Sequence, residues 1–136
     1  MLGAMGQAFG CDRCYGADPE EVWAYYERGL LIEHELADEA HFIVQVRRCV
    51  ECAQQFFWIF TERVDWEGGE DAQRRNVVPM SPEEAQTLAE SSDLDPAFVA
   101  SLVGDRRRLE TDWPTGELEQ RSEWATGELE ITSEER

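Results

Sequence analysis

Hydrophobic and polar positions alternate along residues 42 to 49, which is the period of a half-buried β-strand. One face carries Phe42, Val44 and Val46, and the other carries Ile43, Gln45 and Arg47. The next run, Phe56 to Trp66, is rich in aromatic and β-branched residues and favours a second strand. Together they predict an antiparallel hairpin over residues 42 to 66 with its aromatic side chains in the core. An uncovered aromatic face would instead suit a protein partner or a second copy of the chain.

Three segments combine a helical period with a helix-start signal. In the first, residues 17 to 29, Asp18 is a capping side chain and Pro19 suits the first helical position. The apolar residues of this segment lie three or four positions apart and share one face: Val22, Trp23, Tyr26 and Leu30. Gly29 is the expected end of the helix.

The sequences Ser81-Pro82-Glu83-Glu84 and Asp95-Pro96 repeat this start signal and predict a helical second half. The last helix is short and is expected to end at Gly104. Its apolar face is expected to pack on the sheet through Phe98, Val99, Leu102 and Val103.

Three shorter segments have weaker patterns. Residues 30 to 39 begin apolar and become acidic, which favours a loop or a short second helix. Residues 76 to 78 predict a short third strand that Pro79 ends or confines to a sheet edge. Gly68 and Gly69, flanked by acidic residues, predict a turn. The alternative is a loop that binds a hard cation, but the ligand spacing of calcium loops is missing.

The C-terminal region contains a repeat. The segment Trp113-Pro114-Thr115-Gly116-Glu117-Leu118-Glu119 recurs from Trp124 to Glu130 with one difference. Glycine in both copies and proline in one argue against a helix and favour extended arms. We therefore expect an α+β domain over residues 1–104 and an acidic tail over residues 105–136. Docking of the tail on its own domain or on a second copy is favoured over a disordered tail or a bivalent recognition peptide.

The chain of 136 residues is strongly acidic, with 30 acidic and 12 basic residues and a net charge of −18. Such a field repels phosphate backbones, so nucleic acid is not an expected partner. No apolar run approaches the roughly 18 to 20 residues of a membrane-spanning helix, and no secretory signal is evident. We expect a soluble, cytoplasmic protein without a membrane partner.

All four cysteines fall in two Cys-x-x-Cys pairs. Two residues between ligands let one tight turn direct both sulfurs to one ion, and two such turns complete a four-coordinate site. In a reducing cytosol, paired motifs of this kind are more often metal ligands than disulfides. The predicted metal ligands are Cys11, Cys14, Cys49 and Cys52. A shell closed by four thiolates leaves no position for substrate, which favours a structural role over hydrolysis.

At these cysteines the chain resembles the zinc-ribbon and rubredoxin-like class of four-cysteine metal-binding domains. The resemblance covers the two pairs and the hairpin that follows, and it implies a structural zinc centre on a zinc-ribbon-like antiparallel hairpin or small sheet. The alternative is a rubredoxin-like iron centre that transfers electrons. The 34 residues between Cys14 and Cys49 would hold the first helix as an insertion. Tyr15 and Ala53 stand where glycine often follows the second cysteine of a pair.

Two histidines, His34 and His41, precede the second pair and are weaker ligand candidates, because four cysteines already saturate one ion. No nucleophile, histidine and acid constellation stands out among the many carboxylates, so no catalytic residue is assigned. We expect a non-enzymatic interaction or regulatory module. Its acidic surface would bind a protein partner with a basic face, and a homodimer is a further expectation.

Overall fold

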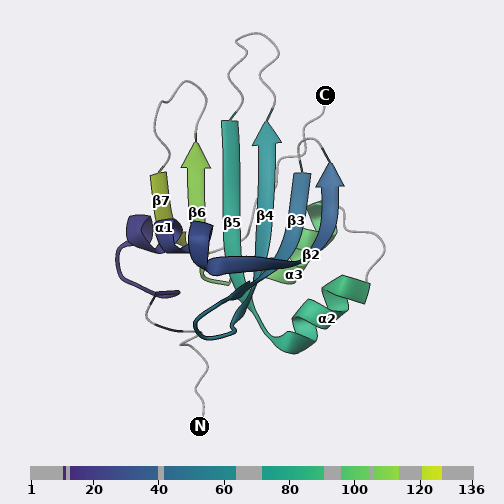
Figure 1. Ribbon diagram of the computed structural model, residues 1–136. Coiled ribbons are helices and arrows are strands. Elements are labelled where there is room, and N and C mark those ends of the chain that lie inside the picture. The colour runs from purple at the N-terminus through teal and green to yellow at the C-terminus, as the bar shows by residue number, and fades with distance from the viewer. Residues whose placement is uncertain are drawn as a thin grey trace.

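The computed structural model describes residues 11, 13–39, 42–63, 72–90, 96–104, 106–113 and 121–126. Its elements in chain order are α1 (Pro19–Gly29), β2 (Leu30–Glu39), β3 (Phe42–Cys49), β4 (Gln55–Arg63), β5 (Ala72–Met80), α2 (Pro82–Glu90), α3 (Pro96–Val103), β6 (Arg108–Trp113) and β7 (Arg121–Ala125). The six strands form one antiparallel sheet in sequence order, with β2 and β7 at its edges (Figure 1). The predicted α+β class is confirmed, whereas the finer zinc-ribbon-like fold stays a prediction.

Each face of the sheet carries its own hydrophobic core. On one face α1 packs across β6 and β7, and its buried residues meet Phe56, Trp58 and Val77 (Figure 1). On the other face α2 and α3 cover Val44, Phe57 and Ile59 together with their neighbours. The alternation predicted for β3 is therefore confirmed, because successive side chains of a strand point to opposite faces. Of the aromatic residues of β4, Phe56, Phe57 and Trp58 lie in the core as predicted, whereas Phe60 is half-buried.

The helix starts follow the predicted local chemistry. The carboxylate of Asp18 accepts a hydrogen bond from the amide of Glu20 at 3.0 Å, with Pro19 in the first helical turn. At α2 the side chains of Ser81 and Glu84 each bond to the other's backbone amide, at 3.1 and 2.9 Å, which is a reciprocal capping box. Helix α3 ends at Val103, and Gly104 follows with a φ of 61°.

The expected loop or helix over residues 30 to 39 is wrong, because β2 occupies this segment and pairs with β3 along its length. Among its acidic residues, Glu35 is exposed, and Glu33 is half-buried and accepts hydrogen bonds from Arg48 and Gln55. Its register shifts twice, between Ile32 and His34 and between Glu35 and Ala37. These irregularities break the period of two that identifies a strand in sequence.

The third strand is longer than predicted and lies inside the sheet. β5 runs from Ala72 to Met80 between β4 and β6, so Pro79 neither ends it nor confines it to an edge. Pairing with β6 stops at Val77, which leaves Pro79 paired with β4 alone. The carbonyl of Pro79 accepts a hydrogen bond from the side chain of Arg106 at 2.8 Å, in place of a backbone hydrogen bond with β6.

Part of the segment expected as a tail belongs to the sheet. Strands β6 and β7 both lie beyond the sequence-based boundary at residue 104. Trp124 packs against the α1-side core, and its indole N–H donates to the carbonyl of Gly16 at 3.1 Å. The division into a domain over residues 1–104 and a tail over residues 105–136 stays a prediction, although β6 and β7 show that parts of the second segment pair with the sheet. Residues 127 to 136, which hold most of the second repeat, lie outside the described residues, as do residues 114 to 120 of the first.

Candidate metal centre

The four cysteines lie at one end of the sheet. Cys11 and Cys14 precede α1, Cys49 is the last residue of β3, and Cys52 lies in the turn to β4. The chain leaves Cys14 through α1 and β2 and returns along β3, so that Leu30 pairs with Cys49. This antiparallel return brings the two pairs together across 34 residues of intervening chain. Cys14 and Cys49 are fully buried, and Cys11 and Cys52 are partly exposed.

The sulfur positions are compatible with a four-coordinate metal site. All four Sγ atoms lie within 4.8 Å of one another. The distances are 3.8 Å for Cys11 to Cys14, 3.9 Å for Cys11 to Cys49 and 3.8 Å for Cys14 to Cys52. Sulfurs about 2.3 Å from one zinc ion, at the corners of a tetrahedron, would lie roughly 3.8 Å apart. A disulfide needs about 2.05 Å, and all four cysteines are free.

The second pair sits in a tightly bonded turn. The amide of Glu51 donates to the sulfur of Cys49 at 3.3 Å, and the amide of Ala53 donates to the carbonyl of Cys49 at 2.9 Å. Ala53 has a φ of 67°, the left-handed conformation that glycine adopts without strain. The sequence-based expectation of glycine at this position thus has a physical basis here. Among the described residues that are not glycine, no other has a positive φ, so the turn at Tyr15 has a different backbone.

Two tyrosines of α1 bind the cysteine cluster. The Tyr25 hydroxyl lies 3.0 Å from the sulfur of Cys49, and the Tyr26 hydroxyl donates to the carbonyl of Cys14 at 2.8 Å. A Cβ atom at Gly29 would overlap the ring of Tyr25, so this glycine makes room for the ring. Both tyrosines are buried. Helix α1 therefore supports the cluster as well as filling the core.

The surroundings shift the pKa values of the cysteines in opposite directions. Burial opposes ionisation of Cys49, but hydrogen bonds from the Tyr25 hydroxyl and from the amides of Cys52 and Glu51 outweigh it and lower its pKa to about 7. Burial raises the pKa of Cys14, and it also raises the pKa of Cys52. One cysteine is thus prepared as a thiolate, the form in which sulfur binds metals.

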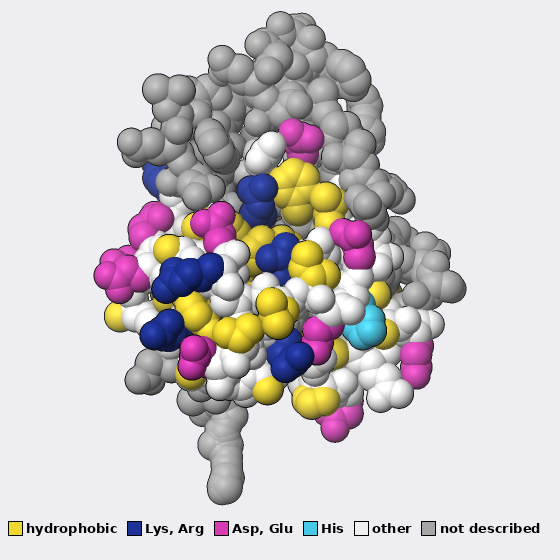
Figure 2. Space-filling view, in the orientation of Figure 1, with side chains coloured by type: hydrophobic (Ala, Val, Ile, Leu, Met, Phe, Trp, Pro, Cys, Tyr) yellow, Lys and Arg dark blue, Asp and Glu magenta, His cyan; other side chains and the backbone are white. Residues whose placement is uncertain are grey.

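Positive charge gathers near this negative centre although the chain is acidic. The guanidinium groups of Arg13 and Arg28 lie 5.6 and 5.5 Å from the centroid of the Tyr25 ring. Arg107 lies 4.2 Å from the centroid of Trp124. Four thiolates around a divalent ion would carry a net charge of about −2, which neighbouring arginines would stabilise. The α1 side of the molecule accordingly shows arginine side chains among hydrophobic ones (Figure 2).

Of the weaker ligand candidates, only His34 lies within the described residues, and it does not join the cluster. His34 lies on β2 opposite Val46 and is exposed, and it is not among the residues that surround the four sulfurs. His41 and the Gly68-Gly69 segment lie outside the described residues. Tyr25 was missed in the sequence, where its only signal was its place on the same helix as Tyr26, with Gly29 one turn later.

No helix within the described residues is long and apolar enough to cross a membrane. No protein-family model, curated protein or solved structure matches this chain. What the molecule can do is therefore argued from its own residues, of which the four clustered cysteines are the most specific.

Proposed function

We propose that this protein is a small zinc-binding module in which Cys11, Cys14, Cys49 and Cys52 hold one structural ion. The observation that carries this proposal is the cluster of four sulfurs within 4.8 Å of one another, in which three sulfur–sulfur distances of 3.8 to 3.9 Å are close to the edge of a tetrahedron around zinc. The donor set agrees, because four thiolates favour zinc or iron over the harder cations magnesium and calcium.

The position of the site supports a scaffolding role. The ion would join the segment before α1 to the β3–β4 turn, two parts of the chain that the sheet does not otherwise connect. Its ligands Cys14 and Cys49 belong to the same hydrophobic cluster as α1. A closed four-thiolate shell has no open position for water or substrate. Structural zinc contributes on the order of 10 kcal/mol to the folding of small domains, so the fold would depend on it.

Metal analysis of untagged protein, combined with a visible absorption spectrum, tests the metal assignment. We expect a colourless protein that contains one zinc per chain. A coloured protein with one iron per chain would replace zinc by the electron-transfer alternative, and a chain that binds neither metal would overturn the metal centre.

Four separate cysteine-to-serine substitutions test whether the cysteines act as ligands or only fill the core. If they act as ligands, Cys52→Ser, at a partly exposed position, should release the metal as completely as Cys14→Ser, at a buried one. If the cysteines only filled the core, Cys52→Ser and Cys11→Ser should have little effect on stability. Only substitution of the two buried cysteines should then lower the urea midpoint. The readouts are bound metal after gel filtration and the urea midpoint of unfolding.

The module's role would lie in binding another protein. The net charge of −18 favours a partner with a basic face, since complementary charge steers association. Exposed apolar residues near the cysteines, Leu31, Ile32 and Val50, would add contact area beside that charge. Candidates captured from native cells at low salt should bind the purified protein with an affinity that falls steeply between 50 and 300 mM salt. A self-association detected by sedimentation and insensitive to salt would favour a homodimer instead.

A further inference from the structure

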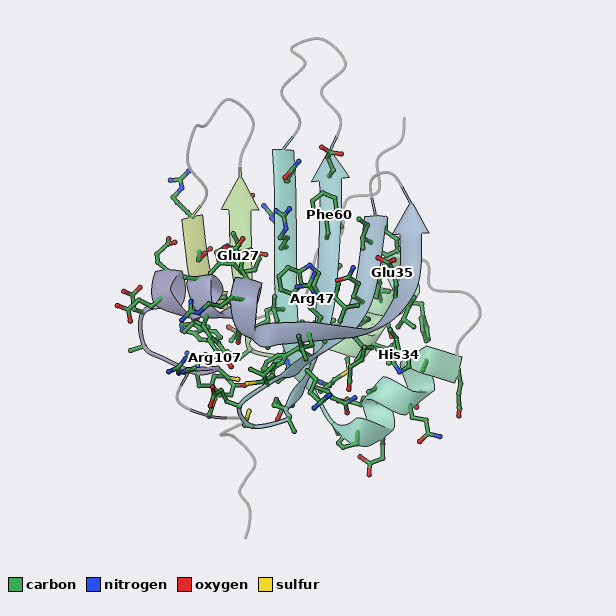
Figure 3. All side chains as sticks on the ribbon, in the orientation of Figure 1. Glu27, His34, Glu35, Arg47, Phe60 and Arg107 are labelled. Carbon is green, nitrogen blue, oxygen red and sulfur yellow. The ribbon has the colours of Figure 1, made fainter. Side chains whose placement is uncertain are left out.

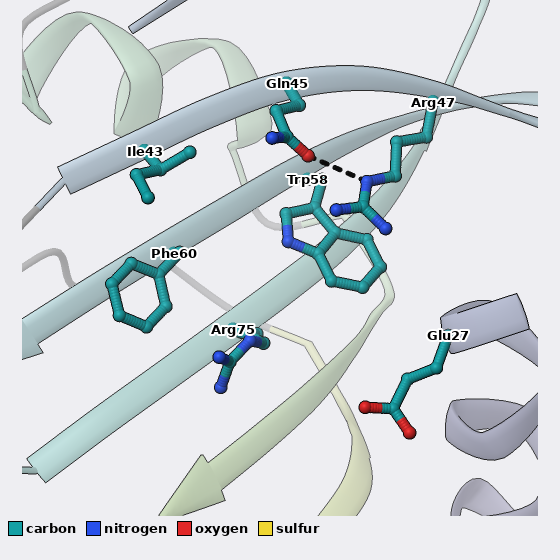
Figure 4. Close-up of a pocket in the computed structure, with 7 residues that line it drawn as sticks. All are labelled: Glu27, Ile43, Gln45, Arg47, Trp58, Phe60 and Arg75. Atoms are coloured by element: carbon teal, nitrogen blue, oxygen red, sulfur yellow. Dashed lines mark hydrogen bonds between the residues drawn. The ribbon is translucent and has the colours of Figure 1, made fainter. Parts of the chain in front are cut away.

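A second feature, separate from the cysteines, lies on the α1 side of the sheet beyond the end of the helix. Seven residues of β3, β4, β5 and α1 line an open hollow of about 350 Å³: Glu27, Ile43, Gln45, Arg47, Trp58, Phe60 and Arg75 (Figure 4). Small-molecule sites have volumes of roughly 300 to 1,000 Å³. We call this hollow the Arg47–Arg75 pocket, and Figure 3 shows Arg47 and Phe60 over the sheet on the side of α1.

The sheet register builds the pocket. Ile43, Phe60 and Arg75 pair in one row across β3, β4 and β5, and Gln45 pairs with Trp58 in the next row. These side chains project from the same face as the core under α1. Trp58 is buried and stacks on Trp23 of the helix, whereas Ile43, Phe60 and Arg75 are only half-buried. The pocket therefore lies next to the α1-side core, and Glu27 of α1 is part of its lining.

Both arginines are held in place by aromatic rings. The Arg47 guanidinium lies 3.5 Å from the centroid of the Trp58 ring, and its Nε donates to the Oε1 of Gln45 at 2.8 Å. Gln45 is fixed in turn, because its Nε2 donates to Glu35 at 2.8 Å. The Arg75 guanidinium lies 4.8 Å from the centroid of Phe60. Stacking restricts each arginine while the terminal nitrogens of Arg47 keep their N–H groups for another acceptor.

Neither arginine has a carboxylate partner within the described residues, although the chain has 30 acidic residues. The adjacent arginines in the sequence, Arg48 and Arg74, point to the opposite face of the sheet and do have carboxylate partners. Arg48 pairs with Glu33 at 2.6 Å, and Arg74 pairs with Asp112 at 3.6 Å. Longer-range attraction to acidic residues favours the charged forms of both arginines. Glu35 acts in this way on Arg47, and Glu27 and Glu62 act on Arg75. Two like charges thus share a hollow without a direct counter-ion.

Burial makes this arrangement costly. It lowers the pKa of Arg47 to about 10, with a smaller contribution from the neighbouring charge of Arg75. It also lowers the pKa of Arg75. Both shifts mean that the charged forms are less well solvated than in water, so an anion placed between the two guanidinium groups would be stabilised by both.

We propose that the Arg47–Arg75 pocket binds a small organic anion, whose carboxylate or phosphate group is held by the two guanidinium groups and whose apolar body lies against Phe60 and Ile43. Guanidinium groups form short, paired hydrogen bonds with either kind of oxyanion. The prior fixing of Arg47 by Trp58 and Gln45 reduces the ordering cost of binding. This proposal does not depend on the metal centre.

A nucleic acid fits the pocket less well than a small anion. Arg47 already covers the face of Trp58, so a base cannot stack there without displacing it. A polyanion would also meet the net charge of −18 over a long path, whereas a small ligand contacts only the pocket, whose lining holds two arginines and one glutamate, Glu27.

Calorimetric titration of the full-length, metal-loaded protein tests the proposal. The probes are benzoate, phenyl phosphate and, as a neutral control, benzyl alcohol. We expect saturable binding of at least one anion and none of the alcohol. Binding of benzoate alone identifies a carboxylate ligand, and binding of phenyl phosphate alone identifies a phosphate ligand.

Matched variants separate this pocket from general charge effects. Arg47→Gln and Arg75→Gln should each weaken binding at least tenfold. Arg48→Gln and Arg74→Gln remove the same charge from the opposite face and should change binding less than twofold. Arg47→Lys, which keeps the charge but not the paired donors, should weaken binding and serves if Arg47→Gln does not fold. Absence of saturable binding, equal binding of benzyl alcohol, or equal losses in the control variants would each overturn the proposal.

Discussion

The hydroxyl of Tyr25 in α1 lies 3.0 Å from the sulfur of Cys49 at the end of β3. This contact joins the helix to the candidate metal centre and favours the thiolate of Cys49, lowering its pKa to about 7. Supporting hydrogen bonds of this kind are worth about 10- to 100-fold in metal affinity. Gly29 is part of the same arrangement, because a side chain there would displace the Tyr25 ring.

Tyr25→Phe should therefore weaken zinc binding about tenfold, by loss of the hydrogen bond to sulfur. Competition with a chromophoric chelator measures this affinity. Tyr26→Phe is the matched control, since its hydroxyl bonds to the carbonyl of Cys14 and not to a sulfur. It should lower stability by about 1 kcal/mol with less effect on zinc affinity. Equal zinc affinities in the wild type and Tyr25→Phe would refute a supporting role for this hydroxyl.

Ala53→Gly should stabilise the protein, because Ala53 has a φ of 67° and a Cβ atom disfavours that conformation by roughly 1 to 2 kcal/mol. Glycine also gains freedom in the unfolded chain, so the expected net gain is about 0.5 to 1 kcal/mol. Urea denaturation measures it. Ala89→Gly, at an exposed position in α2, should instead destabilise by about 1 kcal/mol. A loss of stability in both variants would argue against strain at Ala53.

Glu84 makes stability depend on pH. Its carboxylate bonds to Arg106 at 2.6 and 2.9 Å, and the Arg106 guanidinium lowers its pKa below the ordinary value of 4.5. A depressed folded-state pKa adds stability that is fully present above the unfolded-state value and is lost as the pH falls through the folded-state value. Solvent screens this half-exposed pair, so the contribution at pH 7 should be about 1 kcal/mol or less.

Glu84→Gln should accordingly lower stability at pH 7, and the difference from the wild type should shrink as the pH falls below 4.5. Unfolding free energies measured from pH 7 to pH 3 follow this change. Glu83→Gln, at the exposed neighbouring position, should show a smaller difference at pH 7, because Glu83 has no arginine partner in the part of the chain that the structure describes. A Glu84→Gln difference that is constant with pH would contradict the ion pair as its source.

Trp124 should contribute to stability from outside the sequence-based domain boundary. Its indole bonds to Gly16 at 3.1 Å, and its ring lies 5.6 Å from that of Tyr15. Trp124→Ala should cost about 2 kcal/mol, less than the 3 to 5 kcal/mol typical of a fully buried tryptophan. Trp124→Phe keeps most of the packing and should cost less. An unchanged urea midpoint in Trp124→Ala would restore the view of this segment as an independent tail.

The features predicted correctly were those whose signals lie within a few residues. The caps at Asp18 and Ser81 work through backbone amides two or three positions away. The alternation in β3 needs only its own eight residues. The two cysteine pairs predicted a cluster because each pair is confined to one turn. The predicted hairpin also placed the second pair in the turn between its two strands.

The sequence by itself determined the helix starts, the central hairpin and the identity of the four clustered cysteines. Only the tertiary structure decided that residues 30 to 39 and two segments after residue 104 join the sheet, that Tyr25 reaches Cys49, and that Arg47 and Arg75 share a pocket. The reason is physical. A capping bond or a tight turn is fixed by neighbouring residues, whereas a strand partner or a contact across the sheet depends on which distant segments the whole chain packs side by side.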